Sequence, residues 1–162
     1  MIEIRTARAS DIATLRWIFI AASLSNVGDR DQLLANPDVL VWPPGGVDEG
    51  RTRVAVAPDG SVVGFTTLAP SDDVVEIEDL FVHPDWMGQG IGRTLVSDVV
   101  ATADASGARS VEVTANEHAR GFYDKLGFVF DREVRTRFRT APRLRLDLRP
   151  PRLEPGSGHQ AP

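Results

Sequence analysis

The stretch that decides the fold runs from residue 74 to residue 99 and reads VVEIEDLFVHPDWMGQGIGRTLVSDV. Its first nine residues are rich in β-branched side chains and alternate with a period near two, which is typical of a strand. Pro84 ends this segment because proline has no amide hydrogen to donate to a sheet. Ile91, Leu95 and Val99 then recur at every fourth position, as on the buried side of a helix. The stretch therefore predicts a strand, a turn and a helix that begins inside the turn.

Three glycines, Gly88, Gly90 and Gly92, stand where this helix begins. The first turn of a helix has free N–H groups at the positive end of its dipole, and glycines let a ligand approach them. The pattern predicts a site for a phosphate-like anion. A Walker loop needs a lysine, which Gly92-Arg93-Thr94 lacks. A dinucleotide fingerprint needs G-x-G-x-x-G directly after a strand, whereas this run is G-x-G-x-G and follows four intervening residues, 84–87.

The run Met87-Gly88-Gln89-Gly90-Ile91-Gly92 resembles the coenzyme A loop of the GCN5-related N-acetyltransferase (GNAT) family, whose pattern is Arg/Gln-x-x-Gly-x-Gly/Ala after a strand. Met87 stands where the family has Arg or Gln, so one side-chain contact is in doubt while the backbone cradle is kept. The resemblance implies that the loop amides hold the pyrophosphate of acetyl-CoA and that the strand backbone pairs with the pantetheine arm. The implied cofactor-binding residues are Leu80, Phe81, Val82, Met87, Gly88, Gln89, Gly90, Ile91, Gly92, Arg93 and Asn116. The alternative is a glycine-rich turn without a ligand.

A second motif, NEHARGFYDKLGF, covers residues 116–128. By itself it predicts an amphipathic helix that Asn116 caps and Gly127 ends, with aromatic side chains in the core. It also matches Asn-x-x-Ala-x-x-x-Tyr-x-x-x-Gly-Phe, the second signature of the same family, at the expected distance after the first. The resemblance implies that Tyr123 is the general acid that protonates the leaving thiolate. The alternative is that its phenol only packs in the core.

Acetyl transfer requires a neutral amine, although a lysine-like amine has an unperturbed pKa of about 10.4. Glu76 and Glu78 share one face of the strand, and either could take the amine proton. We favour Glu78 because it lies nearer to residues 80–82, where the resemblance places the backbone amide that stabilises the carbonyl oxygen. The alternative is that these carboxylates, with their acidic neighbours, only solvate the strand. Together they would favour a cationic acceptor such as a polyamine, an aminoglycoside or a lysine side chain.

The length of 162 residues suits one domain, which we predict to span residues 1–148 and to be followed by a disordered tail over 149–162. The chain has no cysteine, which excludes a thiol nucleophile and Cys-ligated metals. His83 and His118 have no metal-ligand spacing, so we interpret both as structural or surface residues and predict no metal. No signal peptide is evident and the apolar stretch 15–24 is too short to span a membrane, so we expect a cytoplasmic protein without a membrane partner.

The net charge of −5 is unevenly distributed, because residues 132–152 hold eight arginines against two carboxylates. Their alternation is typical of the solvated face of a hairpin. Nucleic-acid binding is the sharper alternative, but the rest of the chain is acidic and Phe138 is the only aromatic residue in this segment, so we expect no nucleic-acid partner.

The order of elements predicts an α/β (α+β) fold. Strands are expected near residues 2–5, 53–57, 61–68, 74–82, 110–114, 127–134 and 143–148, and helices near 10–25, 29–35, 91–106 and 116–126. The helix between strands 74–82 and 110–114 makes these two strands parallel neighbours. With the resemblance, this is the GNAT fold: a mixed, mostly antiparallel sheet of six to seven strands with about four helices and a splayed parallel pair at the cofactor site.

The leading hypothesis is an acetyl-CoA-dependent N-acetyltransferase that moves an acetyl group directly to a primary amine of a small molecule or a peptide. A non-catalytic CoA-binding regulatory domain of the same fold is the alternative. In the resembled family the region after the first helix, here residues 26–50, forms one wall of the acceptor site. Homodimers are frequent in that family, and the sequence leaves the oligomeric state open.

Overall fold

The computed structural model describes residues 1–149. In chain order the elements are β1 (Glu3–Thr6), η1 (Ala9–Asp11), α1 (Ile12–Leu24), α2 (Val27–Ala35), η2 (Pro37–Leu40), α3 (Gly45–Asp48), β2 (Thr52–Val56), β3 (Val62–Ser71), β4 (Val74–Val82), η3 (Pro84–Trp86), α4 (Ile91–Ala105), β5 (Ser110–Thr114), α5 (Glu117–Lys125), β6 (Val129–Arg135) and β7 (Thr140–Asp147), where η marks a 3₁₀ helix. Apart from residue 149, the predicted tail lies outside the described residues. No helix within residues 1–149 is long and apolar enough to cross a membrane.

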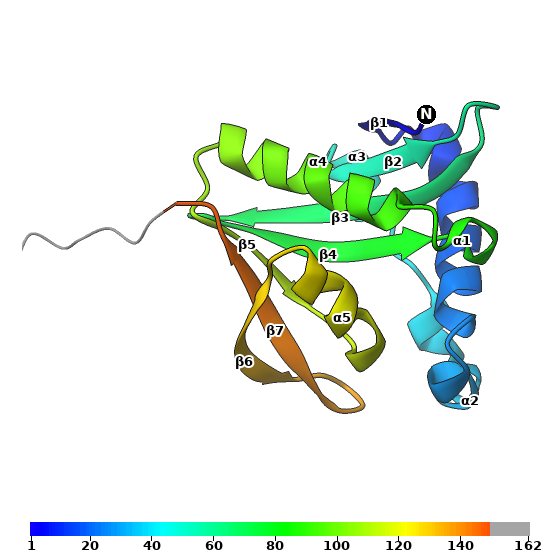
Figure 1. Ribbon diagram of the computed structural model, residues 1–162. Coiled ribbons are helices and arrows are strands. Elements are labelled where there is room, and N and C mark those ends of the chain that lie inside the picture. The colour runs from blue at the N-terminus through cyan, green and yellow to red at the C-terminus, as the bar shows by residue number, and fades with distance from the viewer. Residues whose placement is uncertain (150–162) are drawn as a thin grey trace, which may run out of the picture.

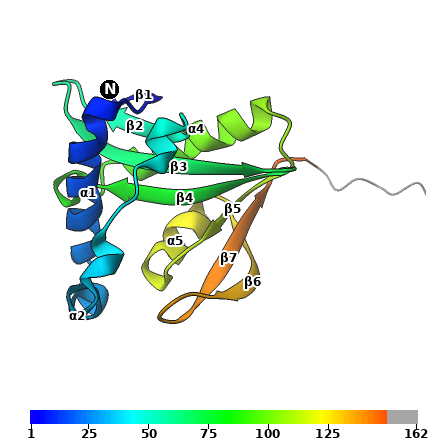
Figure 2. The ribbon, with the colours of Figure 1, turned by 180° about the vertical axis from the view of Figure 1, so that it is seen from behind.

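The strands form one seven-stranded sheet in the order β1-β2-β3-β4-β5-β7-β6. Every neighbouring pair is antiparallel except β4 and β5, which run parallel. Figure 1 shows α4 and α5 on one face of the sheet, and Figure 2 shows α1 and α3 on the other. The predicted fold class is confirmed, with seven strands and five α-helices in the described part of the chain.

Several element bounds differ from the expectations, among them those of α3 and of the last strand. Residues 42–46 were expected to form a loop, but α3 begins at Gly45 behind Pro44, whose carbonyl accepts the Val47 amide at 2.9 Å. The fixed φ of proline suits this helix start. The last strand begins at Thr140 and not at residue 143, because its first residues pair with the end of β6 at Arg135.

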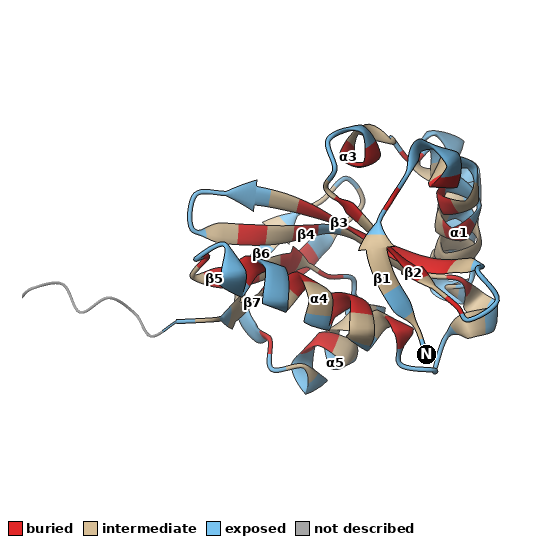
Figure 3. Ribbon diagram, turned by 90° about the horizontal axis from the view of Figure 1, so that it is seen from above, coloured by how far each residue is buried: buried red, intermediate tan, exposed pale blue. Residues whose placement is uncertain are grey.

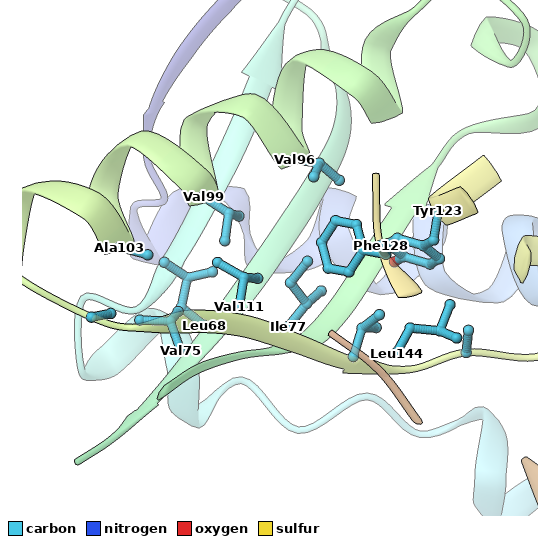
Figure 4. Packing of buried hydrophobic residues seen from close by; sticks show 13 residues of the cluster. Leu68, Val75, Ile77, Val96, Val99, Ala103, Val111, Tyr123, Phe128 and Leu144 are labelled. Carbon is cyan, nitrogen blue, oxygen red and sulfur yellow. The ribbon is translucent and has the colours of Figure 1, made fainter. Parts of the chain in front are cut away.

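Apolar side chains fill both faces of the sheet. Val96, Val99 and Ala103 of α4 pack against the parallel pair, and this cluster also contains Tyr123 of α5 and Leu144 of β7. Figure 4 shows these side chains converging between α4 and the strands, and Figure 3 shows the buried side of α4 turned toward the sheet. On the opposite face a second cluster is built from seven buried residues: Ala7, Leu15, Ile18, Trp42, Val47, Val54 and Phe65. The central strands are therefore covered by apolar side chains on both faces of the sheet.

A β-bulge interrupts the pairing of β3 with β4. Thr67 pairs with Asp79 and Leu68 pairs with Ile77, so Glu78 has no partner on β3. A bulge leaves two successive side chains on one side of the strand. Accordingly Glu78 and Asp79 both line a small pocket of about 330 Å³ beside α3.

Candidate active site

A cleft of about 940 Å³ lies at the carboxyl ends of β4 and β5. Four parts of the chain line it: the end of α1 with α2, the end of β4 with the turn into α4, the helix α5, and the β6–β7 connection. A cleft beside the carboxyl ends of parallel strands is a common ligand site in α/β proteins.

The cleft exists because β4 and β5 separate. Their parallel pairing ends at Ile77 and Val113, whereas β4 continues to Val82. The amide of His83 donates to Val63 of β3 at 2.9 Å. Because hydrogen-bonding direction alternates along an antiparallel strand, the N–H and C=O groups of Leu80 and Val82 then point away from β3, into the gap. The end of β4 therefore offers an unpaired backbone edge to the cleft.

The turn between β4 and α4 also has free backbone donors. Gly88 and Gly90 have φ values of 78° and 81°, a left-handed conformation that favours glycine. Gly90 is the N-cap residue of α4, and no side chain caps this helix start. A Cβ atom at either glycine would meet nothing within 4 Å. The first turn of α4 thus presents open amides and a positive dipole end to the cleft.

Charge in the cleft is opposite to that of the whole chain. The lining includes the cations Arg93, Lys125 and Arg139 against one carboxylate, Asp29, while the chain carries −5 overall. Cationic side chains near a helix start suit phosphate groups. Of the eleven predicted cofactor-binding residues, Gln89 is absent from the lining and the other ten line the cleft: Leu80, Phe81, Val82, Met87, Gly88, Gly90, Ile91, Gly92, Arg93 and Asn116.

Asn116 and Tyr123 reach the cleft from α5. The side chain of Asn116 caps the helix by accepting the Ala119 amide at 2.8 Å. The Tyr123 ring is only 4% exposed and packs edge-on against Phe122 and Phe128 with centroid distances of 5.0 and 5.2 Å. Burial raises the pKa of Tyr123 well above its ordinary value, so the hydroxyl keeps its proton at neutral pH.

Comparison with known proteins shows which family the chain belongs to. A model of the acetyltransferase (GNAT) family matches residues 17–128, more than half of the chain. The chain belongs to the GNAT family. A streptothricin acetyltransferase from Streptomyces lavendulae is 30% identical over 154 residues, covering 79% of this chain and 82% of that protein. Together with the family match, such relatives identify an N-acetyltransferase.

Solved structures of GNAT proteins share the fold. A GCN5-related N-acetyltransferase from Rhodopseudomonas palustris superposes with a TM-score of 0.75 at 22% identity, covering 90% of this chain and 95% of that one. The PaiA N-acetyltransferase from Thermoplasma acidophilum, solved in complex with coenzyme A, gives a TM-score of 0.71 at 17% identity, covering 91% of this chain and 99% of that one.

In this GNAT protein the two predicted general bases lie outside the cleft. Glu78 lines the small pocket beside α3, and its Oε2 atom is 3.1 Å from Nη1 of Arg51. Glu76 faces β7, where its Oε1 atom is 3.0 Å from Nη1 of Arg143. Each carboxylate is thus engaged by a guanidinium, and neither is among the residues that line the cleft.

Three polar residues of the GNAT cleft were not predicted from the sequence. Asp29 of α2 meets both Arg139 of the β6–β7 connection, at 2.5 Å, and His118 of α5, at 3.4 Å. His118 was interpreted as structural or surface, and the structure places it in the cleft lining. No local pattern joins these residues, because 89 and 110 positions separate Asp29 from the other two. The only signals were two expectations about loops: that residues 26–50 form one wall of the site, and that residues 135–142 also supply acceptor contacts.

His83 and most arginines of the arginine-rich segment have structural partners. His83 accepts the Asp85 amide through Nδ1 at 3.1 Å and stacks on Trp17 with ring centroids 4.2 Å apart. Six arginines of the arginine-rich segment form ion pairs with carboxylates of the same chain: Arg132, Arg137, Arg139, Arg143, Arg145 and Arg149. Within residues 1–149 no three His, Asp or Glu side chains are placed to hold a metal ion.

Proposed function

We propose that this GNAT protein transfers an acetyl group from acetyl-CoA to a primary amine of a small molecule, directly and within a ternary complex. The observation that carries the proposal is one cleft whose lining joins the unpaired edge of β4, the uncapped start of α4 and Tyr123. The same proposal includes the cytoplasmic location that the sequence led us to expect. It leaves open whether the protein is a monomer or a homodimer.

The residues of the cleft fit coenzyme A along its length. The open amides at Gly90 and the residues after it, with Arg93 beside them, suit a pyrophosphate. Lys125 adds a second cation at the end of α5. The unpaired backbone of Leu80 and Val82 suits the amide groups of the pantetheine arm. A coenzyme A complex of the PaiA relative supports the same class of ligand.

Acetyl-CoA, when bound, supplies an acetyl thioester whose carbonyl carbon can be attacked by an amine. The amides of Leu80 and Val82 are free to donate to an oxygen that gains charge. The Tyr123 hydroxyl retains a proton that it can give to a leaving thiolate. The protein thus offers a hydrogen-bond donor and an acid in one cleft.

The acceptor side of the cleft is lined by short polar side chains. Ser23, Ser25, Asn26 and Gln32 face it from α1 and α2, and Thr136 faces it from the β6–β7 connection. Hydroxyl and amide groups suit a hydrogen-bonding small molecule. The relative named for streptothricin supports an amine of that kind. We therefore propose small polyfunctional amines as acceptors.

The test is thiol release from acetyl-CoA with streptothricin, spermidine and kanamycin as amines, for the wild type and Tyr123→Phe. We expect turnover with at least one amine and a fall in kcat of about 100-fold in the variant, the usual size of a general-acid contribution. Acetyl-CoA binding should be unchanged, because the phenyl ring keeps the packing. Binding without turnover by either protein would instead indicate a regulatory domain.

A further inference from the structure

Asp29, His118 and Arg139 come from three separate parts of the chain and meet on the wall of the cleft. Oδ1 of Asp29 contacts Nη2 of Arg139 at 2.5 Å, and Oδ2 lies 3.4 Å from Nε2 of His118. The Asp29 side chain is 17% exposed, whereas that of His118 is 44% exposed. The arrangement is a mostly buried carboxylate held by an arginine on one oxygen, with an accessible imidazole on the other.

These residues are distinctive within the cleft. Among the described residues that line it, Asp29 is the only carboxylate and His118 is the only imidazole. Glu76 and Glu78, the candidates from the sequence, each pair with an arginine outside the lining. A group that takes a proton from a bound amine must lie within hydrogen-bond reach of it or be linked by one water. Of these candidates, only Asp29 and His118 lie in the cleft, where a bound amine could be reached.

We propose that His118 is the general base that takes the proton of the acceptor ammonium, with Asp29 and Arg139 as its positioning residues. The proposal rests on the acetyltransferase function proposed above. It also indicates that the ammonium group of the acceptor binds at the mouth of the cleft between α2 and α5.

The proton balance follows from the contacts. Oδ2 of Asp29 lies 3.4 Å from Nε2 of His118, a charge contact that favours the tautomer with its hydrogen on Nε2 and leaves the lone pair of Nδ1 to accept. An N–H bond of the ammonium breaks, its electron pair stays on the amine nitrogen, and the proton joins Nδ1. The resulting imidazolium is stabilised by the carboxylate of Asp29 and later releases the proton to water. Arg139 holds the other carboxylate oxygen and so fixes the direction of Oδ2.

The charged groups around His118 favour this cycle. Asp29 faces it from α2, Arg139 lies behind Asp29 on the β6–β7 connection, and on α5 its neighbours in sequence are Glu117 and Arg120. The carboxylate and the guanidinium largely cancel each other while the imidazole is neutral. A proton gained by His118 is therefore met by a carboxylate at 3.4 Å.

The experiment is the pH dependence of kcat and kcat/KM for the wild type, His118→Gln, Asp29→Asn and Glu78→Gln, with the best acceptor of the amine panel. Asp38→Asn is the matched control, because Asp38 also pairs with an arginine of the β6–β7 connection, Arg137, but is not a cleft residue. Calorimetric titration with acetyl-CoA verifies that each variant is folded and binds the cofactor.

We expect His118→Gln to lower kcat by about 100-fold at neutral pH, with acetyl-CoA affinity unchanged. The wild-type rate should fall below neutral pH. The rate of His118→Gln should instead rise steadily over the whole pH range, because the free amine must then come from solution. Asp29→Asn should lower kcat less than His118→Gln and leave the KM for the amine unchanged, a split that a purely structural role would not give. Asp38→Asn and Glu78→Gln should follow the wild type.

Retention by His118→Gln of wild-type kcat and of the acidic limb would overturn the proposal and leave the acetyltransferase function standing. If Glu78→Gln lost kcat in the same way, the general base would be Glu78 of β4, and the proposal would also be overturned. A wild type that binds acetyl-CoA and acetylates no amine of the panel would overturn both the proposed function and this inference.

Discussion

Tyr123 is the residue at which the core and the cleft meet. Its ring belongs to the cluster between α4 and the parallel pair, and the residue also lines the cleft. A phenol in such surroundings is disfavoured as an anion because burial removes water from the charged form. The hydroxyl therefore remains a proton donor over the whole physiological range, which a general acid needs.

The chain has a single tyrosine, so its ionisation can be followed without interference from others. Burial raises the pKa of Tyr123, and the folded protein should show no tyrosinate absorbance at pH values where an exposed phenol, with a pKa of about 10, is already half ionised. In denaturant the band should appear at about pH 10. A folded protein whose tyrosinate band grew at the same pH as that of the denatured chain would contradict the burial of this side chain.

The first helix is positioned by an acidic residue at its start. Asp11 accepts hydrogen bonds from both guanidinium Nη atoms of Arg5, at 2.8 and 3.1 Å, and from the Arg8 amide at 2.7 Å. These contacts tie the end of β1 to α1, whose far end supplies Phe19 and Ala22 to the cleft. The hydrogen bond from Arg5 is the main reason that the pKa of Asp11 is lowered.

We expect Asp11→Asn to lower the free energy of unfolding by about 1–3 kcal/mol at neutral pH, the usual value of charged hydrogen bonds. A lowered folded-state pKa means that the contribution is present above pH 3.8 and is lost as the pH falls through the lowered value. Denaturant unfolding of the wild type and the variant, at neutral pH and below pH 3, measures this contribution of Asp11. A pH of 3 is about one unit under the ordinary pKa of Asp. Asp38→Asn, at an exposed ion pair, should leave the midpoint unchanged. A deficit for Asp11→Asn that persisted undiminished at the acid pH would contradict this account.

The elements that carry a strong local pattern were predicted with their bounds. Residues 74–82 and 110–114 form β4 and β5 as expected, because β-branched runs flanked by turn residues leave few alternatives. Weakly patterned residues were less predictable. The strand expected over 61–68 extends to Ser71, since its last residues pair with β4 across a tight turn at residues 72–73. Such extensions depend on a partner strand and not on local sequence.

At the scale of the whole molecule, local motifs account for one part of the cleft lining, and the other part depends on long-range contacts that no motif reveals. The glycine turn, Asn116 and Tyr123 lie in two continuous motifs, and the structure brings them into one cleft. The contacts of Asp29 with His118 and Arg139 depend on how α2, α5 and the β6–β7 connection fold together. The positions of Glu76 and Glu78 likewise depend on Arg143 of β7 and on Arg51, which precedes β2, and a strand period alone does not reveal these contacts.

The central claim is that the turn before α4 binds the phosphates of acetyl-CoA. Gly90 and Gly107 stand at opposite ends of α4, both with positive φ, of 81° and 82°, and both with nothing within 4 Å of an added Cβ. Gly90→Glu and Gly107→Glu therefore impose the same backbone strain and the same charge, and only the first places that charge in the cleft.

The most direct test is calorimetric titration of acetyl-CoA into the wild type and these two variants. We predict saturable binding to the wild type and to Gly107→Glu, and at least a tenfold loss of affinity in Gly90→Glu, which corresponds to about 1.4 kcal/mol. Equal binding by all three proteins, or no binding by the wild type, would contradict the claim that this turn is the cofactor site.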